Sequence, residues 1–343
     1  MTLKKFGRKP SGAHLQKIYQ SPNYKDGSFK NLSPTEVMAA ESGSMFKTLM
    51  EFMNKPKNTV PPSRLPSIKT ELKNLKSDKT ALVWFGHSSY FISMEGKTIL
   101  VDPVFSGSAS PLGLGFKSFD GSDVYKVEDF PEIDVLILTH DHYDHLDYDT
   151  ILKLKPKIKH ICTSLGVGSH LSYWGFDASI IREFDWWETD DIINGISLTA
   201  APARHFSGRG IKRGQTLWSS FILKSNDWSI YIGADSGYDS HFKEIGEKFG
   251  PFDLAILEAG QYNVKWSAIH MMPEETVQAT IDLNAKVLLP VHWGKFTLAL
   301  HAWDEPIERV LLRAEKLNVK VSTPLIGEKV VLGESYPNKK WWR

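Results

Sequence analysis

The sequence of 343 residues contains a single cysteine, Cys162. One cysteine cannot form an intramolecular disulfide framework, and it cannot supply the several thiolates of a cysteine-rich metal site. Long apolar runs are also missing: no stretch approaches the ~18 uninterrupted apolar residues of a membrane-spanning helix, and the polar N-terminus lacks the apolar core of a signal peptide. We therefore expect a cytoplasmic protein without disulfides.

The net charge of +1 hides an uneven distribution of charge along the chain. Residues 1–80 hold 15 lysines and arginines against 6 acidic residues, which leaves residues 81–343 net acidic. A basic segment beside an acidic body indicates either an anionic partner surface or docking of the segment on its own body, and self-docking is favoured. The acidic body and the lack of a basic-aromatic stripe argue against a nucleic-acid partner.

We expect residues 1–80 to form an extension of the main domain. Residues 1–32 are polar and rich in turn-forming residues, which predicts irregular structure wrapped on the body. Residues 33–36 (Ser-Pro-Thr-Glu) match a helix capping box and predict an amphipathic, methionine-rich helix to about Asn54. A proline-rich linker over residues 56–66 follows.

From Ala81 the pattern changes to short apolar segments, and residues 81–343 are expected to form one domain. Segments 81–85, 90–94 and 98–101 predict a three-stranded β-meander. Further strands alternate with helices, which is typical of a mixed α/β layered domain. The expected strands are 133–138, 158–163, 196–200, 229–232, 254–257 and 287–289, and the expected helices are 148–154, 242–249, 273–283 and 306–317.

A dense group of polar residues follows the apolar strand expected over residues 133–138. It contains His140, His142, Asp144 and His145. The first two are separated by one residue, so in an extended chain their side chains point the same way, and the other two can fold back beside them. Closely packed imidazoles and carboxylates are typical of a divalent metal site.

Each of three later strands ends in a further candidate ligand: His205, Asp235 and His292. The sequence thus predicts two ligand sets, the first of His140, His142 and His205 and the second of Asp144, His145 and His292. Asp235 can bridge both sets through its two oxygens. Two cations held about 3.5–4 Å apart would make a water molecule nucleophilic at neutral pH. The summed charge of such a centre favours an anionic ester over a neutral amide.

Three more residues are expected near this centre. Asp102, at the end of the third meander strand, is expected to accept a hydrogen bond from a ligand histidine, with a simple turn role before Pro103 as the alternative. His87 is another neighbour by strand order. His270 precedes a helix and is expected to hydrogen-bond the scissile group or the leaving oxygen, with a structural role at the helix entry as the alternative.

Together these residues resemble the metallo-β-lactamase fold superfamily of binuclear hydrolases over about residues 81–300. The flanks are more specifically similar to the phospholipases D that hydrolyse N-acyl-phosphatidylethanolamine and to their bacterial relatives. The matching stretches are residues 86–87, 102–106, 145–148, 185–188, 233–238, 244–246, 249–253, 270, 273–275 and 292–296. The resemblance implies a four-layer αβ/βα sandwich with the metals at one edge, and it assigns ligand roles to the same seven residues. Asp235 stands where true metallo-β-lactamases commonly place a cysteine, which argues against a dedicated β-lactamase.

The sequence therefore predicts a binuclear metal-dependent hydrolase, with Asp144, Asp235 and His270 as its catalytic residues. A phosphodiesterase of phospholipase D type, acting on N-acyl-phosphatidylethanolamine or a similar phospholipid, is favoured. The alternative is a soluble substrate such as a sugar-phosphate lactone or a small phosphoester. We expect two zinc ions, although histidine and aspartate ligands also accept manganese or iron. Residues 1–54 are a candidate for peripheral contact with the inner face of the membrane, and a homodimer is left open.

Overall fold

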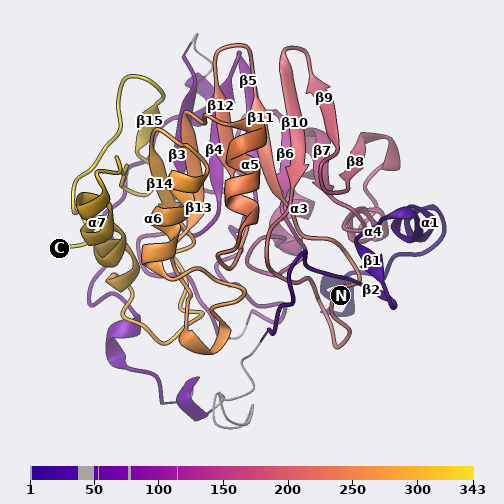
Figure 1. The fold of residues 1–343 in the computed structure, drawn as a ribbon, viewed down its shortest axis with the longest axis horizontal. Helices are drawn as coiled ribbons and strands as arrows, with labels where there is room; N and C mark the ends of the chain where they lie inside the picture. The colour runs from indigo at the N-terminus through magenta and orange to yellow at the C-terminus, as the bar shows by residue number, and fades with distance from the viewer. Residues whose placement is uncertain (1, 38–49, 53, 76–78, 114) are drawn as a thin grey trace.

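The computed structural model describes residues 2–37, 50–52, 54–75, 79–113 and 115–343 of the chain. Two β-sheets lie face to face, and helices cover their outer faces, so the molecule has four layers (Figure 1). This is the αβ/βα sandwich expected from the sequence.

Among the described residues, one sheet has seven strands and the other has six. The first sheet consists, in spatial order, of β15 (Lys329–Val331), β3 (Ala81–Trp84), β4 (Tyr90–Met94), β5 (Lys97–Val101), β6 (Ile133–Leu138), β7 (Ile158–Ser164) and β8 (Ile181–Phe184). The second consists of β14 (Leu288–Val291), β13 (Leu254–Glu258), β12 (Ser229–Ile232), β11 (Ser220–Lys224), β10 (Ile196–Ala201) and β9 (Thr189–Ile193). A short hairpin of β1 (Tyr24–Lys25) and β2 (Ser28–Phe29) lies apart from both sheets.

The helices follow the same order along the chain. The α-helices are α1 (Ala13–Gln20), α3 (Tyr148–Leu154), α4 (Gly168–Tyr173), α5 (His241–Phe249), α6 (Pro273–Asp282) and α7 (Glu305–Leu317). Short 3-10 helices are η1 (Thr2–Phe6), η3 (Lys57–Thr59), η4 (Leu72–Asn74), η5 (Val127–Asp129), η6 (Lys155–Lys157), η7 (Ala178–Ile180) and η8 (Val264–Trp266). No helix among the described residues is both long enough and apolar enough to cross a bilayer.

Each sheet begins antiparallel and continues parallel. The predicted meander of β3, β4 and β5 is antiparallel, and β5 through β8 are parallel. In the second sheet β9 through β12 are antiparallel, whereas β12, β13 and β14 are parallel. Every residue of β6 is buried, because a parallel strand inside a sandwich is covered on both faces. The carboxyl ends of the parallel strands therefore meet at one edge of the sandwich.

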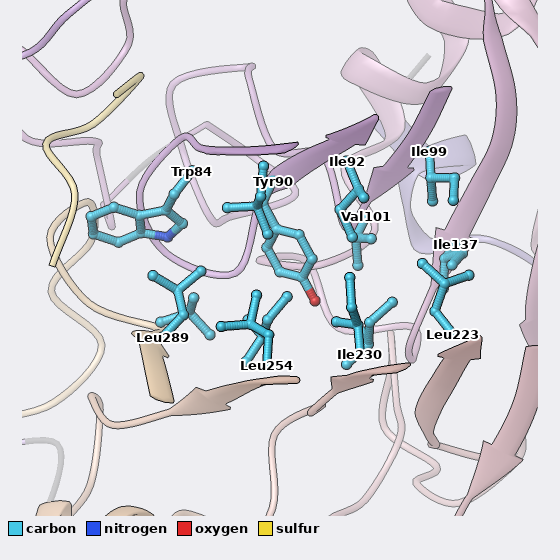
Figure 2. Packing of buried hydrophobic residues seen from close by; sticks show 14 of the residues in the cluster. Trp84, Tyr90, Ile92, Ile99, Val101, Ile137, Leu223, Ile230, Leu254 and Leu289 are labelled. Carbon is cyan, nitrogen blue, oxygen red and sulfur yellow. The ribbon is translucent and has the colours of Figure 1, made fainter. Parts of the chain in front are cut away.

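The main core fills the space between the two sheets (Figure 2). From the first sheet, Trp84, Tyr90 and Val101 point toward the second sheet, where they meet Leu254 and Leu289. All five side chains are at most 1% exposed. Burying each one stabilises the fold by roughly 1.5–3 kcal/mol, so this core fixes how the two sheets face each other.

Two further cores attach the outer helices. Ile151 of α3 and Leu171 of α4 pack against the outer face of the first sheet. Phe242 of α5, Val277 of α6 and Val310 of α7 pack against the outer face of the second sheet. Figure 1 shows α5 and α6 lying in front of β12 and β13.

The N-terminal region is more ordered than the sequence predicts. Residues 1–32 were expected to be irregular, but they contain the helix α1 and the β1–β2 hairpin. The helix predicted to begin at residues 33–36 is wrong at its start, because residues 34–36 are not helical. Arg204 explains the difference: its guanidinium donates to the Pro34 carbonyl and to the Thr35 hydroxyl, which holds this segment on the body. Most of the remaining predicted helix, residues 38–49 and 53, lies outside the described residues.

Candidate metal centre

The predicted ligands come together at the edge where the strands end. His140 and the residues after it follow β6, and His205 follows β10 by four residues. Asp235 and His292 follow β12 and β14. All seven predicted ligand side chains take part in two adjoining groups of ring nitrogens and carboxylate oxygens.

The first group contains the three histidines that the sequence assigned to one set. The His142 Nδ1 atom lies 3.0 Å from His140 Nε2 and 3.2 Å from His205 Nε2. One carboxylate oxygen of Asp235, Oδ2, lies 3.9 Å from His140 Nε2 and 3.8 Å from His205 Nε2. These four atoms all lie within 4.8 Å of one another, a spacing that one cation can span.

The second group contains the second predicted set and one additional histidine. The Asp144 Oδ2 atom lies 3.7 Å from His145 Nε2 and 3.0 Å from His87 Nε2. Asp235 Oδ1 lies 3.2 Å from both His145 Nε2 and His292 Nδ1. Asp235 therefore faces the first group with one oxygen and the second group with the other, as a bridging carboxylate would.

For two of these rings, hydrogen bonds fix which nitrogen is free to bind a cation. The Ile269 carbonyl can only accept, so His205 Nδ1 carries a proton at 2.9 Å from it, and its Nε2 lone pair faces the cluster. His145 Nδ1 donates to Asp102 Oδ2 at 2.7 Å in the same way. Ligand histidines in metalloproteins are oriented by such acceptors behind them.

The resulting cluster fits a cation better than it fits an empty core. His145 Nε2 and Asp235 Oδ1 are buried and make no hydrogen bond among the described residues, although each faces the other. Because His145 Nδ1 already pairs with Asp102, its Nε2 and the Asp235 oxygen can face each other only if a positive charge lies between them, either a proton or a bound cation. The donor set, with imidazoles and carboxylates but no thiolate, accepts zinc, manganese or iron.

Burial keeps most of the imidazoles in the neutral form that binds metal. It lowers the pKa of His140, His205 and His292 well below the usual value. His145 differs: burial lowers its pKa too, but the charges of Asp235 and Asp144 outweigh this and raise the pKa well above the usual value. The centre is thus acidic enough to attract positive charge.

Asp102 supports both ligand groups from behind. It is 1% exposed, and besides His145 it accepts hydrogen bonds from the Thr139 backbone N–H at 2.9 Å and from the Thr139 hydroxyl at 2.6 Å. Because the Thr139 proton goes to the carboxylate, its oxygen must accept from His140 Nδ1 at 3.0 Å. One carboxylate therefore sets the tautomer of a histidine in each group.

His87 lies closer to the cluster than the sequence argument placed it. Its Nε2 contacts Asp144, and its buried Nδ1 has no hydrogen-bond partner among the described residues. Its backbone exchanges hydrogen bonds with the segment after β14, since His87 N–H donates to the Trp293 carbonyl and His292 N–H donates to the His87 carbonyl. Both His87 and His292 adopt positive φ angles, 53° and 67°, which turn the chain sharply where it passes the cluster.

His270 lies beside the cluster and has a partner that the sequence argument missed. His270 Nδ1 donates to Glu258 Oε2 at 2.7 Å, and the His270 ring stacks at 5.4 Å on that of His292. Glu258, the last residue of β13, is 1% exposed, and burial raises its pKa. Burial opposes the charged form of His270, but the Glu258 carboxylate outweighs burial and raises the pKa of His270. In the sequence, the acidic Glu258 ends an otherwise apolar strand, and this pattern could have indicated a functional role for it.

Asn31 of the N-terminal region supports His205, and this contact was not predicted from the sequence. The Asn31 side chain accepts from the His205 backbone N–H at 3.1 Å and donates to the His205 carbonyl at 2.8 Å. The same Asn31 oxygen accepts from Trp218 Nε1 at 3.1 Å. Asn31 therefore fixes the backbone that presents this ligand.

A second contact ties the N-terminal segment to the loop of candidate ligands after β6. The buried guanidinium of Arg209 donates to the carbonyls of Asp141 and Leu146 and, on its other side, to the Lys5 carbonyl. His170 Nδ1 accepts from the Arg8 backbone N–H at 3.0 Å. The first residues of the N-terminal segment thus contact the body through backbone groups, at Lys5 and Arg8.

The cluster opens into a cavity of about 590 Å³. His142, Asp144, His205, Asp235, His270 and His292 lie at its base. Its walls are largely apolar and aromatic: Val37, Phe52, Phe116, Phe206, Trp266, Ile269 and Leu298, with Arg213 and Gln261. Phe52 stacks on Trp266 at 6.4 Å, so the described part of the N-terminal region also walls this cavity. The volume suits a small organic ligand.

Comparison with known proteins agrees with this geometry. The family model described as the Beta-lactamase superfamily domain matches residues 97–293. An uncharacterized protein of Mycobacterium tuberculosis is 37% identical over 328 residues, which cover 94% of this chain and 88% of that protein. The N-acyl-phosphatidylethanolamine-hydrolyzing phospholipase D 1 of Caenorhabditis elegans is 34% identical over 233 residues, or 63% of this chain and 64% of that protein.

A solved structure shows the same fold. The metallo hydrolase Igni18 from the archaeon Ignicoccus hospitalis aligns with a TM-score of 0.57 at 20% identity, covering 75% of this chain and all of that one. The family match includes the segments that contain all seven predicted ligands, from His140 to His292. With its two-sheet sandwich and its histidine and aspartate clusters, the chain belongs to the metallo-β-lactamase superfamily of metal-dependent hydrolases.

Proposed function

We propose that this protein is a phosphodiesterase of phospholipase D type that acts on N-acyl-phosphatidylethanolamine or a similar phospholipid. The observation that carries the proposal is the aromatic and aliphatic cavity directly above the ligand cluster, with Phe52, Phe116 and Trp266 in its walls. Such walls suit an acyl chain, whereas a small polar ester would leave them in contact with water. The name of the C. elegans relative supports the same substrate class.

We assign the two cations to the two groups of ligands. His140, His142 and His205 would hold one, Asp144, His145 and His292 would hold the other, and Asp235 would contact both. When bound, two divalent cations lower the pKa of water and neutralise negative charge that develops on a phosphoryl group. The neutral imidazoles and two carboxylates leave the loaded site positive, which favours an anionic ester.

His270 is placed to assist the leaving group. In the hydrolysis a bond forms between phosphorus and a water oxygen, and the bond between phosphorus and the leaving alcohol oxygen breaks. His270 Nδ1 is occupied by Glu258, so Nε2 is the nitrogen that can give a proton to that oxygen. The Glu258 carboxylate stabilises the protonated ring before the transfer and orients it throughout.

The substrate class implies contact with a phospholipid surface, and we propose that the rim of the cavity makes it. Leu32 and Phe116 line the cavities at this face and are 54% and 44% exposed. The exposed Lys30 adds positive charge from the N-terminal region. Deleting residues 1–54 would not test this contact, because Asn31 supports His205. Replacing Lys30 by glutamine and Phe116 by serine leaves that support in place, and binding to anionic vesicles should weaken.

The proposed activity is tested by a substrate screen on protein loaded with zinc, manganese or iron. N-acyl-phosphatidylethanolamine in mixed micelles, a soluble phosphodiester and a sugar-phosphate lactone should be compared. We expect turnover of the phospholipid, with release of phosphatidic acid, and loss of that turnover in Asp235→Asn. Efficient turnover of the lactone or the soluble ester, with none of the phospholipid, would replace the proposal by the alternative substrate class.

A further inference from the structure

A second cavity adjoins the one above the ligand cluster. It has a volume of about 420 Å³, and residues 28–35 of the N-terminal region form one wall. The two cavities share the lining residues Val37, His205, Phe206 and Arg213. They therefore meet at these side chains, beside the first group of ligands.

Arg213 places a positive charge at this junction. Its guanidinium lies over the Phe206 ring, 4.7 Å from the ring centre. The same ring contacts two of the ligand histidines, His142 at 4.6 Å and His205 at 4.9 Å between ring centres. The charge is thus one aromatic ring away from the candidate metal centre.

Among the described residues the guanidinium of Arg213 forms no ion pair, whereas nearby Arg204 pairs with Asp239. No acidic residue of the described chain lines the second cavity, and the acids of the first, Asp144 and Asp235, belong to the ligand cluster. An exposed arginine stacked on an aromatic ring is held in position while its N–H donors stay available to an anion.

The walls of the two cavities differ. The first is lined by aromatic side chains, which suit a hydrocarbon substituent (an arm) of a ligand. The second combines Leu32, Pro34 and Val37 with Lys30. A molecule that fills both must pass the junction, where its centre would lie next to Arg213 and His205.

We infer that the substrate is an ester with two arms and an anionic centre, that its arms occupy the two cavities, and that Arg213 determines specificity by binding the anionic centre at their junction. This inference rests on the proposed function, since a phosphodiester has one negative charge between two arms. It adds a residue and a cavity to that function: Arg213 recognises charge, and residues 28–37 help to select the second arm.

The role of Arg213 is tested by equilibrium binding of dihexyl phosphate to the metal-loaded protein, measured by calorimetry. We expect Arg213→Gln to weaken binding about ten- to hundredfold, as the loss of a charge-assisted contact does, with metal content unchanged. The matched control is Lys212→Gln, which removes an exposed cation that lines a different cavity, and it should change the Kd less than about twofold. Equal Kd values for Arg213→Gln and the parent protein, or equal weakening in the control, would overturn the assignment.

The second cavity is tested by narrowing it. Leu32→Trp adds bulk to its wall, and Leu312→Trp makes the same change at a similarly exposed leucine on α7. We expect Leu32→Trp to weaken dihexyl phosphate about tenfold and hexyl methyl phosphate, which lacks the second arm, by less than twofold. Equal weakening of the binding of both phosphates, or no weakening of either, would refute the two-armed site.

The binding assays separate this inference from the proposed activity. If dihexyl phosphate binds as expected but no phospholipid is hydrolysed, the phospholipase proposal fails and the anion site remains. If phospholipid is hydrolysed and Arg213→Gln changes neither KM nor the Kd for dihexyl phosphate, the proposed function remains and the role of Arg213 is refuted.

Discussion

Replacing Asp102 by asparagine should weaken metal binding at both groups of ligands through a change of one atom. The carboxylate accepts three hydrogen bonds, two of them at Oδ2, from the Thr139 hydroxyl and from His145 Nδ1. A flipped amide would point its nitrogen at the Thr139 backbone N–H, a donor that cannot reverse. With the amide nitrogen at the Oδ2 position instead, both side-chain donors would have to reverse, and the reversal would place protons on His145 Nε2 and, through Thr139, on His140 Nε2.

The magnitude follows from these bonds. A hydrogen bond to a buried charged group contributes about 1.5–3 kcal/mol, and after the change the two reversed bonds no longer involve a charge. Loss of the acceptor behind a ligand histidine lowers metal affinity about 10–100-fold. We therefore expect Asp102→Asn to raise the dissociation constant of each cation by at least about tenfold, measured by competition with a chromophoric chelator.

Asp134→Asn provides the matched control. Asp134 is also a buried aspartate of the first sheet, and its carboxylate accepts from the Thr98 backbone N–H at 2.9 Å and from the Thr98 hydroxyl at 3.0 Å. Because it lies at the start of β6, its loss should lower the free energy of unfolding but leave metal affinity unchanged. Unchanged metal affinity in Asp102→Asn, or an equal loss in both variants, would refute the tautomer argument.

Three further predictions concern other parts of the chain. Burial lowers the pKa of His241 to about 4, so the free energy of unfolding should fall as the pH drops from about 6.5 to 4, by up to about 3 kcal/mol, and His241→Gln should lack this component in urea titrations. A pH dependence in the variant equal to or larger than that of the parent would contradict this role of His241. Burial raises the pKa of Cys162 to about 12, so a thiol reagent at pH 8 should label the denatured protein and leave the native protein unmodified; rapid native labelling would show that this strand is not covered. Asn31→Ala removes the support of His205 and should lower metal affinity severalfold, whereas Asn23→Ala, which removes a contact with Asp185, should not; equal affinities in the two variants would exclude this role for Asn31.

Much of the fold was predictable because its central strands are continuous apolar segments. The segment 133–138 coincides with β6, and the helix expected over 148–154 coincides with α3. The strands β8 and β9 were missed because they are polar and partly exposed, so neither has the apolar pattern of a central strand. The central strand β11 was missed as well, although four of its five residues are buried. The helix α1 was missed because it begins after Gly12 without a side-chain cap and buries one residue, Ile18.

The convergence of the predicted ligands could also be inferred from the positions of the strands. Residues that follow parallel strands meet at one edge, so His140, Asp235 and His292 could be grouped from strand ends alone. Contacts between distant segments could not be found in this way. Asn31 reaches His205 across 174 residues of sequence, and no local pattern around Asn31 distinguishes it from an ordinary turn residue.

The cavity above the ligand cluster is the feature that the sequence predicts least. Its walls combine Phe52, Phe116, Trp266 and Leu298, which come from four separate segments. An apolar residue in a loop is usually part of the packing or an isolated exposed side chain, and only the folded chain shows that these four face one space. Arg213 lies in a loop as well, and its lack of a carboxylate partner within the described structure is visible only in three dimensions.

The most direct test of this account is a crystal structure of the metal-loaded protein with anomalous diffraction recorded at the absorption edge of the bound metal. We predict two anomalous peaks, one among His140, His142 and His205 and the other among Asp144, His145 and His292, with an oxygen of Asp235 at each. A single peak, or a peak away from these side chains, would contradict the binuclear centre on which the proposed chemistry depends.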